Sequence, residues 1–453
     1  MNWKQILFPL FLGALATHPC AHAMSFPPPA PRDASGVDLQ IEGKVSLPYM
    51  SGKGGPAYLQ VTVRAGDLEV HDRRPMNVAV VVDRSGSMAE EAKIENVRSA
   101  LYRLIDQLKS DDILSLVIYD DVVEVLRPAS RVGSKHEIRR LLDEVYPRGW
   151  TNLGGGLVEG FRQAERNACN SYSNRVILLS DGLANRGITD PHELGQIAAR
   201  YCGKSISLTT MGVGLAYNEN LMVGLANNGG GNYYFIECSN DLAAIFHQEF
   251  HSLTALVAQN AALELTLGDG VRLLDAIGCR HQENGRVHSI FLGDFTANET
   301  RELTVELDVP AGTGTRTIAT GRLSYDTERG HQYANRALTA VIHYVSDLAE
   351  VDRHRNMEAQ AKADIAISTR AVERGMQALD EGRHEDAAAQ LAAAKAAIAA
   401  SPAAVQGGSV GSLVKDQETK LSTYLQLFED KNADVRRVKK SVQYENYKVQ
   451  KKK

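Results

Sequence analysis

The stretch MNVAVVVDRSGSM, residues 76–88, joins a run of apolar side chains to an abruptly polar segment. Valine, which dominates the run, is β-branched and favours strands. An apolar run without alternation is typical of a parallel strand that is covered on both faces. We therefore predict a buried strand that ends near Asp83. The polar residues that follow, in a D-x-S-x-S spacing, would leave this strand at the edge of a sheet.

The sequence beyond this strand alternates between helix and strand patterns as far as residue 255. Residues 92–109 carry apolar side chains at helical spacing, and residues 112–120 and 122–128 form two short β patterns close enough to pair. Further strand patterns, separated by helix patterns, occupy residues 175–180, 205–213 and 232–237. The alternation predicts an α/β domain with a doubly wound, mostly parallel, Rossmann-like sheet that has helices on both faces.

Folds of this kind bind ligands at the carboxyl ends of their strands, where the strand order reverses. Five oxygen-bearing side chains are predicted to gather at that edge: Asp83, Ser85, Ser87, Thr151 and Asp181. Oxygen ligands with few carboxylates suit a hard divalent cation. We expect Mg²⁺, with Mn²⁺ or Ca²⁺ as alternatives. Neutral hydroxyl ligands would leave the ion enough charge to accept a carboxylate from a partner.

The segments DRSGSM, TNLGGGL and LLSDG resemble, in order and spacing, the metal-ion-dependent adhesion site of von Willebrand factor type A domains, including the inserted domains of integrins. The resemblance covers residues 73–255. It implies that the five side chains are metal ligands and that the domain binds other proteins through the ion. The whole chain is similar to secreted bacterial type A proteins and, more distantly, to inter-alpha-trypsin inhibitor heavy chains.

The flanking segments predict two further parts of the chain. Residues 24–72 contain N-terminal strand patterns, and residues 256–346 contain alternating β patterns with turn signals that indicate a β-sandwich. We expect the early strands to join this sandwich, which would make the metal-binding domain an insertion. Residues 347–430 predict a helical region with one hairpin that resembles a tetratricopeptide repeat, and residues 431–453 predict a solvated basic tail.

The N-terminus predicts export from the cytoplasm. Residues 1–23 combine Lys4, a short apolar run and a small-residue cleavage site after Ala23, which is typical of a secretory signal peptide. The residues before Cys20 differ from the small, apolar lead-in of a lipidated cysteine. We therefore expect a secreted or periplasmic protein with no membrane-spanning segment in the mature chain. A formal net charge of -5 argues against nucleic acid as a partner.

Four cysteines follow the predicted signal peptide, and an oxidising compartment would allow them to form disulfides. Cys169 and Cys202 precede two strand patterns that we expect to be neighbours, so these thiols are predicted to pair. Cys238 and Cys279 would then form a second disulfide. Isolated buried thiols are the alternative for both pairs.

Three functions are compatible with a metal at this site. The first is binding of a protein partner that presents an acidic side chain or a carboxy-terminus to the ion. The second is metal-dependent hydrolysis, which needs a general base near the bound water. The motif loops contain no histidine and no spare carboxylate, so we expect no enzyme. The third is a purely structural ion, whose removal would unfold the domain.

A binding function predicts that the loops around the metal carry the partner contacts. Aromatic and arginine side chains dominate the energetics of protein interfaces. The candidates in or near these loops are Arg84, Trp150, Arg186 and Tyr217. Each has an alternative role as a core residue or a solvated loop residue.

Overall fold

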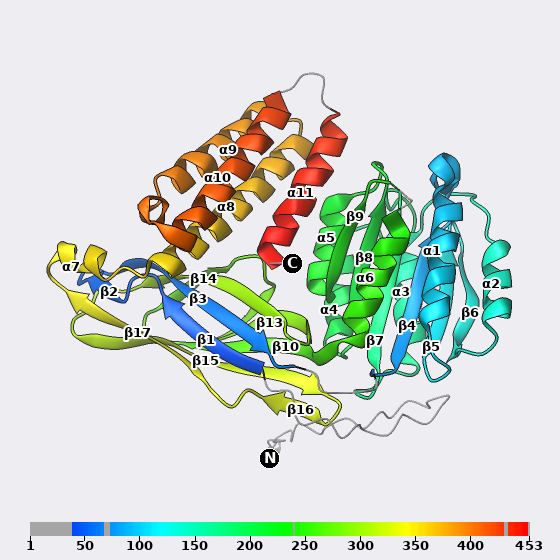
Figure 1. Ribbon diagram of the computed structural model, residues 1–453, viewed down its shortest axis with the longest axis horizontal. Coiled ribbons are helices and arrows are strands. Elements are labelled where there is room, and N and C mark those ends of the chain that lie inside the picture. Colours follow the sequence, from blue (N-terminus) through cyan, green and yellow to red (C-terminus); the bar gives the residue numbers. More distant parts are fainter. Residues whose placement is uncertain (1–38, 68–72, 239–240, 430–433, 452–453) are drawn as a thin grey trace, which may run out of the picture.

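The computed structural model describes residues 39–67, 73–238, 241–429 and 434–451. The predicted signal peptide, with Cys20, lies outside the described residues. Three parts lie side by side: a six-stranded α/β domain, a β-sandwich and a group of C-terminal helices (Figure 1). None of the described helices has the combination of length and hydrophobicity that a membrane-spanning helix needs.

The sheet of the α/β domain has the order β6-β5-β4-β7-β8-β9, and its edge strand β6 runs antiparallel to β5. Its strands are β4 (Met76–Asp83), β5 (Ile113–Tyr119), β6 (Val123–Arg131), β7 (Ser173–Ser180), β8 (Ser207–Val213) and β9 (Gly230–Ile236). The helices of this domain are the 3₁₀ helix η1 (Gly86–Ala92), α1 (Lys93–Gln107), α2 (Lys135–Asp143), α3 (Leu153–Glu165), α4 (Pro191–Cys202), α5 (Glu219–Asn228) and α6 (Leu242–Thr254). The strand order reverses between β4 and β7, because the chain adds β5 on one side of β4 and β7 on the other.

Successive residues of β4 face two separate cores. Val78, Val80 and Val82 pack with α1, α2 and α6, whereas Ala79 and Val81 pack with α3, α4 and α5. Every residue of the strand is buried, as its apolar run from Val78 to Val82 predicts. Helices therefore cover both faces of the sheet, and the predicted doubly wound fold is confirmed.

The sandwich consists of two sheets around one core. One sheet has the order β1-β3-β14-β11, and the other has the order β12-β13-β10-β15-β17-β2, with β16 paired to β15. Their strands are β1 (Leu39–Val45), β2 (Tyr49–Ser51), β3 (Gly55–Ala65), β10 (Leu256–Leu267), β11 (Arg272–Ala276), β12 (His281–Asn284), β13 (Val287–Thr296), β14 (Thr300–Val309), β15 (Thr315–Thr327), β16 (Gly330–Tyr333) and β17 (Leu338–Val345). Because β3 pairs with β14, strands from before and after the α/β domain form one sheet. The α/β domain is therefore inserted into the sandwich between β3 and β10.

The C-terminal helices pack around a core of their own. They are α7 (Leu348–Arg353), α8 (Met357–Asp380), α9 (His384–Ala399), the 3₁₀ helix η3 (Pro402–Val405), α10 (Gly408–Glu429) and α11 (Val435–Lys451). Ion pairs fix α8 to the sandwich: Lys362 Nζ lies 3.0 Å from a carboxylate oxygen of Glu302, and a guanidinium nitrogen of Arg370 lies 2.9 Å from Glu306. The helical part is thus anchored on the sheet that contains β14.

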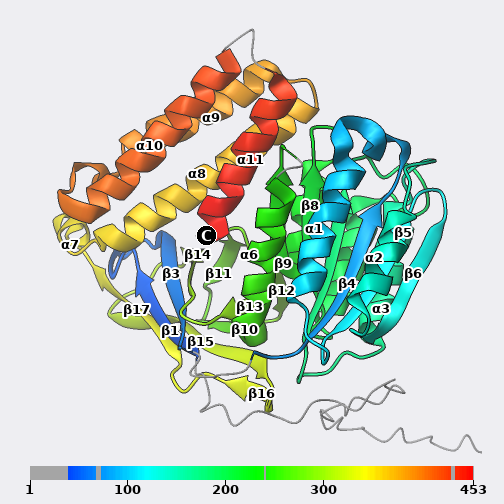
Figure 2. The ribbon, with the colours of Figure 1, turned by 45° about the vertical axis from the view of Figure 1, so that its right-hand side comes forward.

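The prediction of a solvated basic tail is wrong, because most of that segment forms α11. This helix lies between α8 and β9 in both views (Figures 1 and 2). Val438, Val442 and Tyr447 are buried. Lys440 is only 3% exposed and pairs with Glu219 at the start of α5, with 2.6 Å between nitrogen and oxygen. The many basic residues of this segment predict an exposed tail. That prediction overlooks the apolar residues that recur along the helix and the acidic partner Glu219.

The predicted disulfides are also wrong, since Cys169, Cys202, Cys238 and Cys279 are all free thiols. The expected neighbours β7 and β8 do pair in parallel. Cys169, however, packs against the small cluster of Ile113, Ala129 and Tyr172, whereas Cys202 ends α4 and lines a cavity next to β9. The two thiols therefore pack in different surroundings and do not meet.

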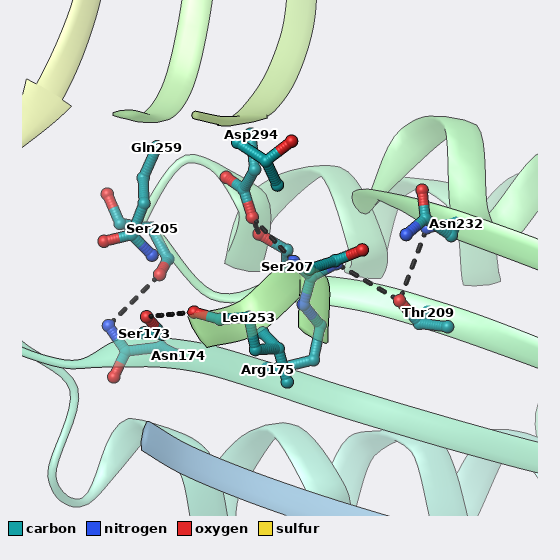
Figure 3. Close-up of polar contacts among 12 residues, drawn as sticks. Ser173, Asn174, Arg175, Ser205, Ser207, Thr209, Asn232, Leu253, Gln259 and Asp294 are labelled. Atoms are coloured by element: carbon teal, nitrogen blue, oxygen red, sulfur yellow. Dashed lines mark hydrogen bonds and ion pairs between the residues drawn. The ribbon is translucent and has the colours of Figure 1, made fainter. Parts of the chain in front are cut away.

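A buried polar cluster joins the α/β domain to the sandwich (Figure 3). Arg175 on β7 is 3% exposed and donates to Asp294 on β13 at 3.0 Å. Its other terminal nitrogen lies 3.4 Å from the fully buried carboxylate of Glu249 on α6. Ser207 also donates to Asp294, at 2.5 Å. We call these four residues the Arg175 cluster, in which a cation of the α/β domain is paired with a carboxylate of the sandwich across the boundary between the two parts.

Candidate metal centre

The five predicted ligand residues lie at one edge of the α/β sheet. Asp83 is the last residue of β4, and Asp181 directly follows the adjacent parallel strand β7. Ser85 precedes η1, Ser87 lies within it, and Thr151 lies just before α3. Four of the side chains are buried and that of Ser87 is half-buried. They come from three loops at the point where the strand order reverses, which is where such folds bind ligands.

Backbone hydrogen bonds fix these loops against one another. The N–H of Gly86 donates to the carbonyl of Gly149 at 3.2 Å, which ties the first loop to the loop before α3. The N–H of Asn185 donates to the carbonyl of Thr151 at 3.1 Å, and the N–H of Thr151 donates to the side-chain oxygen of Asn185 at 2.9 Å. The loop before α3 is therefore also held against the loop that follows Asp181.

Hydrogen bonds orient the Asp83 carboxylate. One oxygen accepts the backbone N–H of Ser85 at 2.8 Å. The other accepts the hydroxyl of Ser180 at 2.8 Å and that of Tyr119 at 3.3 Å. Burial, the largest influence, nevertheless raises the pKa of Asp83 to about 6 because it removes the carboxylate from water. This aspartate is thus held rigidly in a position where its negative charge is poorly solvated.

Three hydroxyl oxygens converge on the space beside Gly182. A Cβ atom at this position would lie 3.3 Å from Thr151 Oγ1, 3.7 Å from Ser87 Oγ and 3.9 Å from Ser85 Oγ. The Ser87 hydroxyl also donates to Asp181 at 2.8 Å, and the two serine hydroxyl oxygens are 3.2 Å apart. The glycine leaves room for a small ligand among these oxygens.

Sequence reasoning missed Lys93, a buried lysine beside the site. Its Nζ lies 2.8 Å from Asp181 Oδ2, and its side chain is only 5% exposed. The ammonium also lies 3.4 Å from the carbonyl oxygen of Ser87. Lys93 supplies a counter-charge to Asp181. A lysine at the start of an amphipathic helix ordinarily indicates a solvated residue, so only its position in the fold reveals this contact.

The donor set fits a hard divalent cation better than a soft metal ion, which prefers sulfur ligands. The five side chains offer hydroxyl and carboxylate oxygens, which suit Mg²⁺, Mn²⁺ or Ca²⁺. Elsewhere in the part of the chain that the structure describes, no three histidine, cysteine, aspartate or glutamate side chains are grouped so as to hold a metal. This edge of the sheet is therefore the candidate metal centre.

Two of the predicted partner contacts, Arg84 and Tyr217, are wrong because both side chains are buried. Arg84 is 6% exposed and donates to Asp120 at 2.8 Å, which fixes the loop after β4 to the end of β5. Tyr217 is 2% exposed, and its hydroxyl is hydrogen-bonded to that of Tyr233 at 2.7 Å. Both side chains therefore make contacts inside the domain and are not available on its surface.

The other two candidates, Trp150 and Arg186, lie together on the surface. Trp150 is 58% exposed and directly precedes Thr151. The Arg186 guanidinium lies over its ring at 5.5 Å from the ring centre, and the Arg186 side chain is 59% exposed. An aromatic ring and a guanidinium are thus available to a partner beside the candidate metal centre.

Comparisons with known proteins agree with this geometry. Residues 77–248 match the family model of the von Willebrand factor type A domain. The protein YfbK of Escherichia coli (strain K12) is 28% identical over 208 residues, which cover 46% of this chain and 36% of that protein. Inter-alpha-trypsin inhibitor heavy chain H3 of Pongo abelii is 28% identical over 208 residues, which cover 42% of this chain and 24% of that protein. The matches thus span well under half the length of either relative.

A solved structure, von Willebrand factor type A from Catenulispora acidiphila, shares the fold with a TM-score of 0.71 at 16% sequence identity. The likeness covers 92% of this chain and 98% of that one, so it extends beyond the α/β domain to the sandwich and the helices. The family match, the doubly wound sheet and the order of the motifs lead to one conclusion: residues 77–248 form a von Willebrand factor type A domain.

Proposed function

We propose that this chain is a secreted, metal-dependent protein-binding protein, in which a divalent cation links the candidate metal centre to a carboxylate of a protein partner. Von Willebrand factor type A domains typically mediate metal-dependent protein interactions. The observation that carries the proposal is the convergence of three hydroxyl oxygens beside Gly182, next to two buried aspartates. Export rests on the signal-peptide pattern of residues 1–23.

Asp83, Ser85, Ser87, Thr151 and Asp181 would hold the cation, and Mg²⁺ is the expected ion. When bound, the ion would act as a Lewis acid toward a carboxylate from an acidic side chain or the carboxy-terminus of the partner. The hydroxyl ligands are neutral, so two aspartates alone offset its charge. In the absence of the ion, the Lys93 ammonium neutralises Asp181. This counter-charge inside the protein favours a reversible binding site over a structural one.

The contacts of the two aspartates favour binding over hydrolysis. Their hydrogen-bond partners among the described residues are Ser85, Ser87, Ser180, Tyr119 and Lys93. Within the described part of the chain, neither aspartate has a hydrogen bond or an ion pair to a histidine or a glutamate that could act as a general base toward water. We therefore expect no hydrolase activity.

Two measurements test the proposed function. Calorimetric titration of Mg²⁺ into the metal-stripped protein should show saturable binding at one site, while circular dichroism shows that the stripped protein is folded. A displayed random-peptide library, selected on the immobilised protein in Mg²⁺, should then yield peptides that EDTA releases and that lose binding when their acidic residue is replaced by its amide. Failure to bind Mg²⁺, or peptides that stay bound in EDTA, would overturn the proposal.

Trp150→Ala should weaken binding of the selected peptides by about tenfold and leave the Mg²⁺ affinity unchanged. The ring is exposed and offers a partner a large contact area beside the site, but it is not a ligand. Peptide and metal affinities are compared by calorimetry. Tyr146→Ala, which removes another exposed ring, is the control and should change neither. Equal loss of peptide and metal affinity in Trp150→Ala would show that this residue supports the metal loop instead.

Lys93→Met should raise the Mg²⁺ affinity about tenfold, because the substitution removes a cation that competes for Asp181. The same substitution should lower the melting temperature of the metal-free protein, since it leaves a buried carboxylate without its counter-charge. Calorimetry and thermal unfolding with and without Mg²⁺ measure both effects. Lys109→Met, at an exposed position, serves as the control. A lower Mg²⁺ affinity in Lys93→Met would mean that the lysine orients Asp181 for the ion.

A further inference from the structure

A cavity of about 300 Å³ lies where the three parts of the chain meet. The α/β domain contributes Arg175 and Cys202, and the sandwich contributes Arg280 and Arg301. Lys451 contributes from the end of α11, which reaches this junction in both views (Figures 1 and 2). The volume is within the range of small-molecule sites in proteins.

The acidic residues of the cavity are already paired. Asp294 accepts from Arg175 at 3.0 Å within the Arg175 cluster. Glu299 pairs with Arg301, whose guanidinium also donates to the carbonyl oxygen of Asp294 at 2.7 Å. The cationic groups of Arg175 and Arg301 are thereby offset by acidic groups of the protein.

Arg280 and Lys451 are not offset in this way. Neither side chain forms an ion pair or a hydrogen bond among the residues that the structure describes. The Arg280 guanidinium lies over the ring of Phe291, 3.5 Å from the ring centre, and its Nε is buried without a hydrogen-bond acceptor. The Nε of Arg175 is likewise buried without an acceptor. The cavity thus has an excess of positive charge and of unused donors.

The Glu299 carboxylate acts electrostatically on Lys451, but it is already paired with Arg301. Burial lowers the pKa of both Arg280 and Lys451, as expected for cations that are desolvated without sufficient compensation. The Cys202 thiol lines the same cavity, but burial raises its pKa to about 12, so it is neutral at physiological pH. A buried charge without a partner is costly, and buried donors normally find acceptors.

We propose that this cavity binds a small polyanion, a compact molecule that carries phosphate or carboxylate oxygens, between Arg280 and Lys451. The anion offsets the two cations and accepts the unused guanidinium donors, which bind such oxygens well. Because its contacts come from the sandwich and from α11, next to the α/β domain, the bound anion also strengthens the junction of the three parts. This site is separate from the candidate metal centre and does not depend on the proposed function.

Thermal unfolding and calorimetry with inorganic phosphate, sulfate and citrate test the proposal. The protein carries Asp83→Ala and is stripped of metal, so that no anion acts through a bound cation. At least one of these anions should bind with a dissociation constant below 1 mM and raise the melting temperature, whereas potassium chloride at equal ionic strength should not. The relative affinity for phosphate, sulfate and citrate distinguishes phosphate-type from carboxylate-type ligands.

Arg280→Met removes the charge and keeps a long apolar side chain on Phe291. This substitution should lower the affinity for the anion at least tenfold. Lys451→Met should also lower this affinity. Lys415→Met, at an exposed position on α10, should leave it unchanged. Without anion, Arg280→Met should unfold at no lower temperature than its parent, because it removes a cation that has no partner. Unchanged anion affinity in Arg280→Met, or equal stabilisation by potassium chloride, would overturn the proposal.

Discussion

Replacing Arg175 by methionine is expected to lower the free energy of unfolding by about 3–5 kcal/mol, the usual cost of breaking a buried ion pair on one side. Arg175 is 3% exposed and lies within 3.4 Å of Glu249 and 3.0 Å of Asp294. Methionine fills a similar volume but leaves both buried carboxylates without their cation. The hydroxyl and amide donors that remain, Thr209 and Asn232 on Glu249 among them, compensate in part.

Urea unfolding followed by circular dichroism measures this loss. Lys204→Met is the matched control, because Lys204 forms an ion pair with Glu165 while its own side chain is 48% exposed. A pair of this kind contributes at most about 1 kcal/mol. Adding Asp294→Asn to Arg175→Met should restore part of the lost stability, since it removes one of the unpaired charges. A loss in Arg175→Met no larger than in the control would show that water reaches the cluster.

The second large effect is expected from Asp83→Ala, which should reduce the Mg²⁺ affinity at least a hundredfold. Only two carboxylates are available to offset the charge of the ion, and the substitution removes the one that three hydrogen bonds hold in place. The metal-free variant should remain folded, because the removal of a poorly solvated buried charge offsets the loss of these three hydrogen bonds.

Calorimetric titration of the variant beside the unsubstituted protein measures the loss. Asp106→Ala removes an exposed carboxylate from α1 and controls for a general change in charge. It should bind Mg²⁺ within about twofold of the unsubstituted protein, since Asp106 is not a residue of the candidate metal centre and exposed charges are screened by salt. If Asp83→Ala retained its affinity, the ion would be bound elsewhere and the ligand set proposed for this edge of the sheet would be wrong.

Much of the α/β domain could be predicted because its signals are local. The run from Met76 to Val82 has the length and the β-branched composition of a doubly covered strand, and the helix after it has apolar residues at regular spacing. The convergence of Asp83 and Asp181 also follows from pattern, since both end strands that are parallel neighbours. Because the two strands are adjacent and parallel, Asp83 and Asp181 lie at the same edge of the sheet although they are 98 positions apart in the sequence.

The remaining features depend on contacts that no local pattern contains. Lys93 has the sequence context of a solvated helix residue, yet the fold places its ammonium against Asp181. Tyr217 lies in a loop, and loops are usually exposed, but Tyr233 and Lys440 enclose it. The predicted disulfide between Cys169 and Cys202 rests on the adjacency of β7 and β8, and these strands are indeed neighbours. The distance between the thiols also depends on where the preceding helices end, which the sequence pattern does not show.

The inserted position of the α/β domain has a consequence for synthesis of the chain. Gln60 on β3 and Thr304 on β14 are hydrogen-bonded neighbours 244 residues apart in the sequence. At roughly 5–20 residues per second, a ribosome needs on the order of 10 to 50 s to make the partner of β3 after β3 itself. During that interval β1 and β3 have only each other, with an open edge and an uncovered apolar face. The nascent pair of β1 and β3 therefore exposes a binding site for a chaperone until β14 has been made.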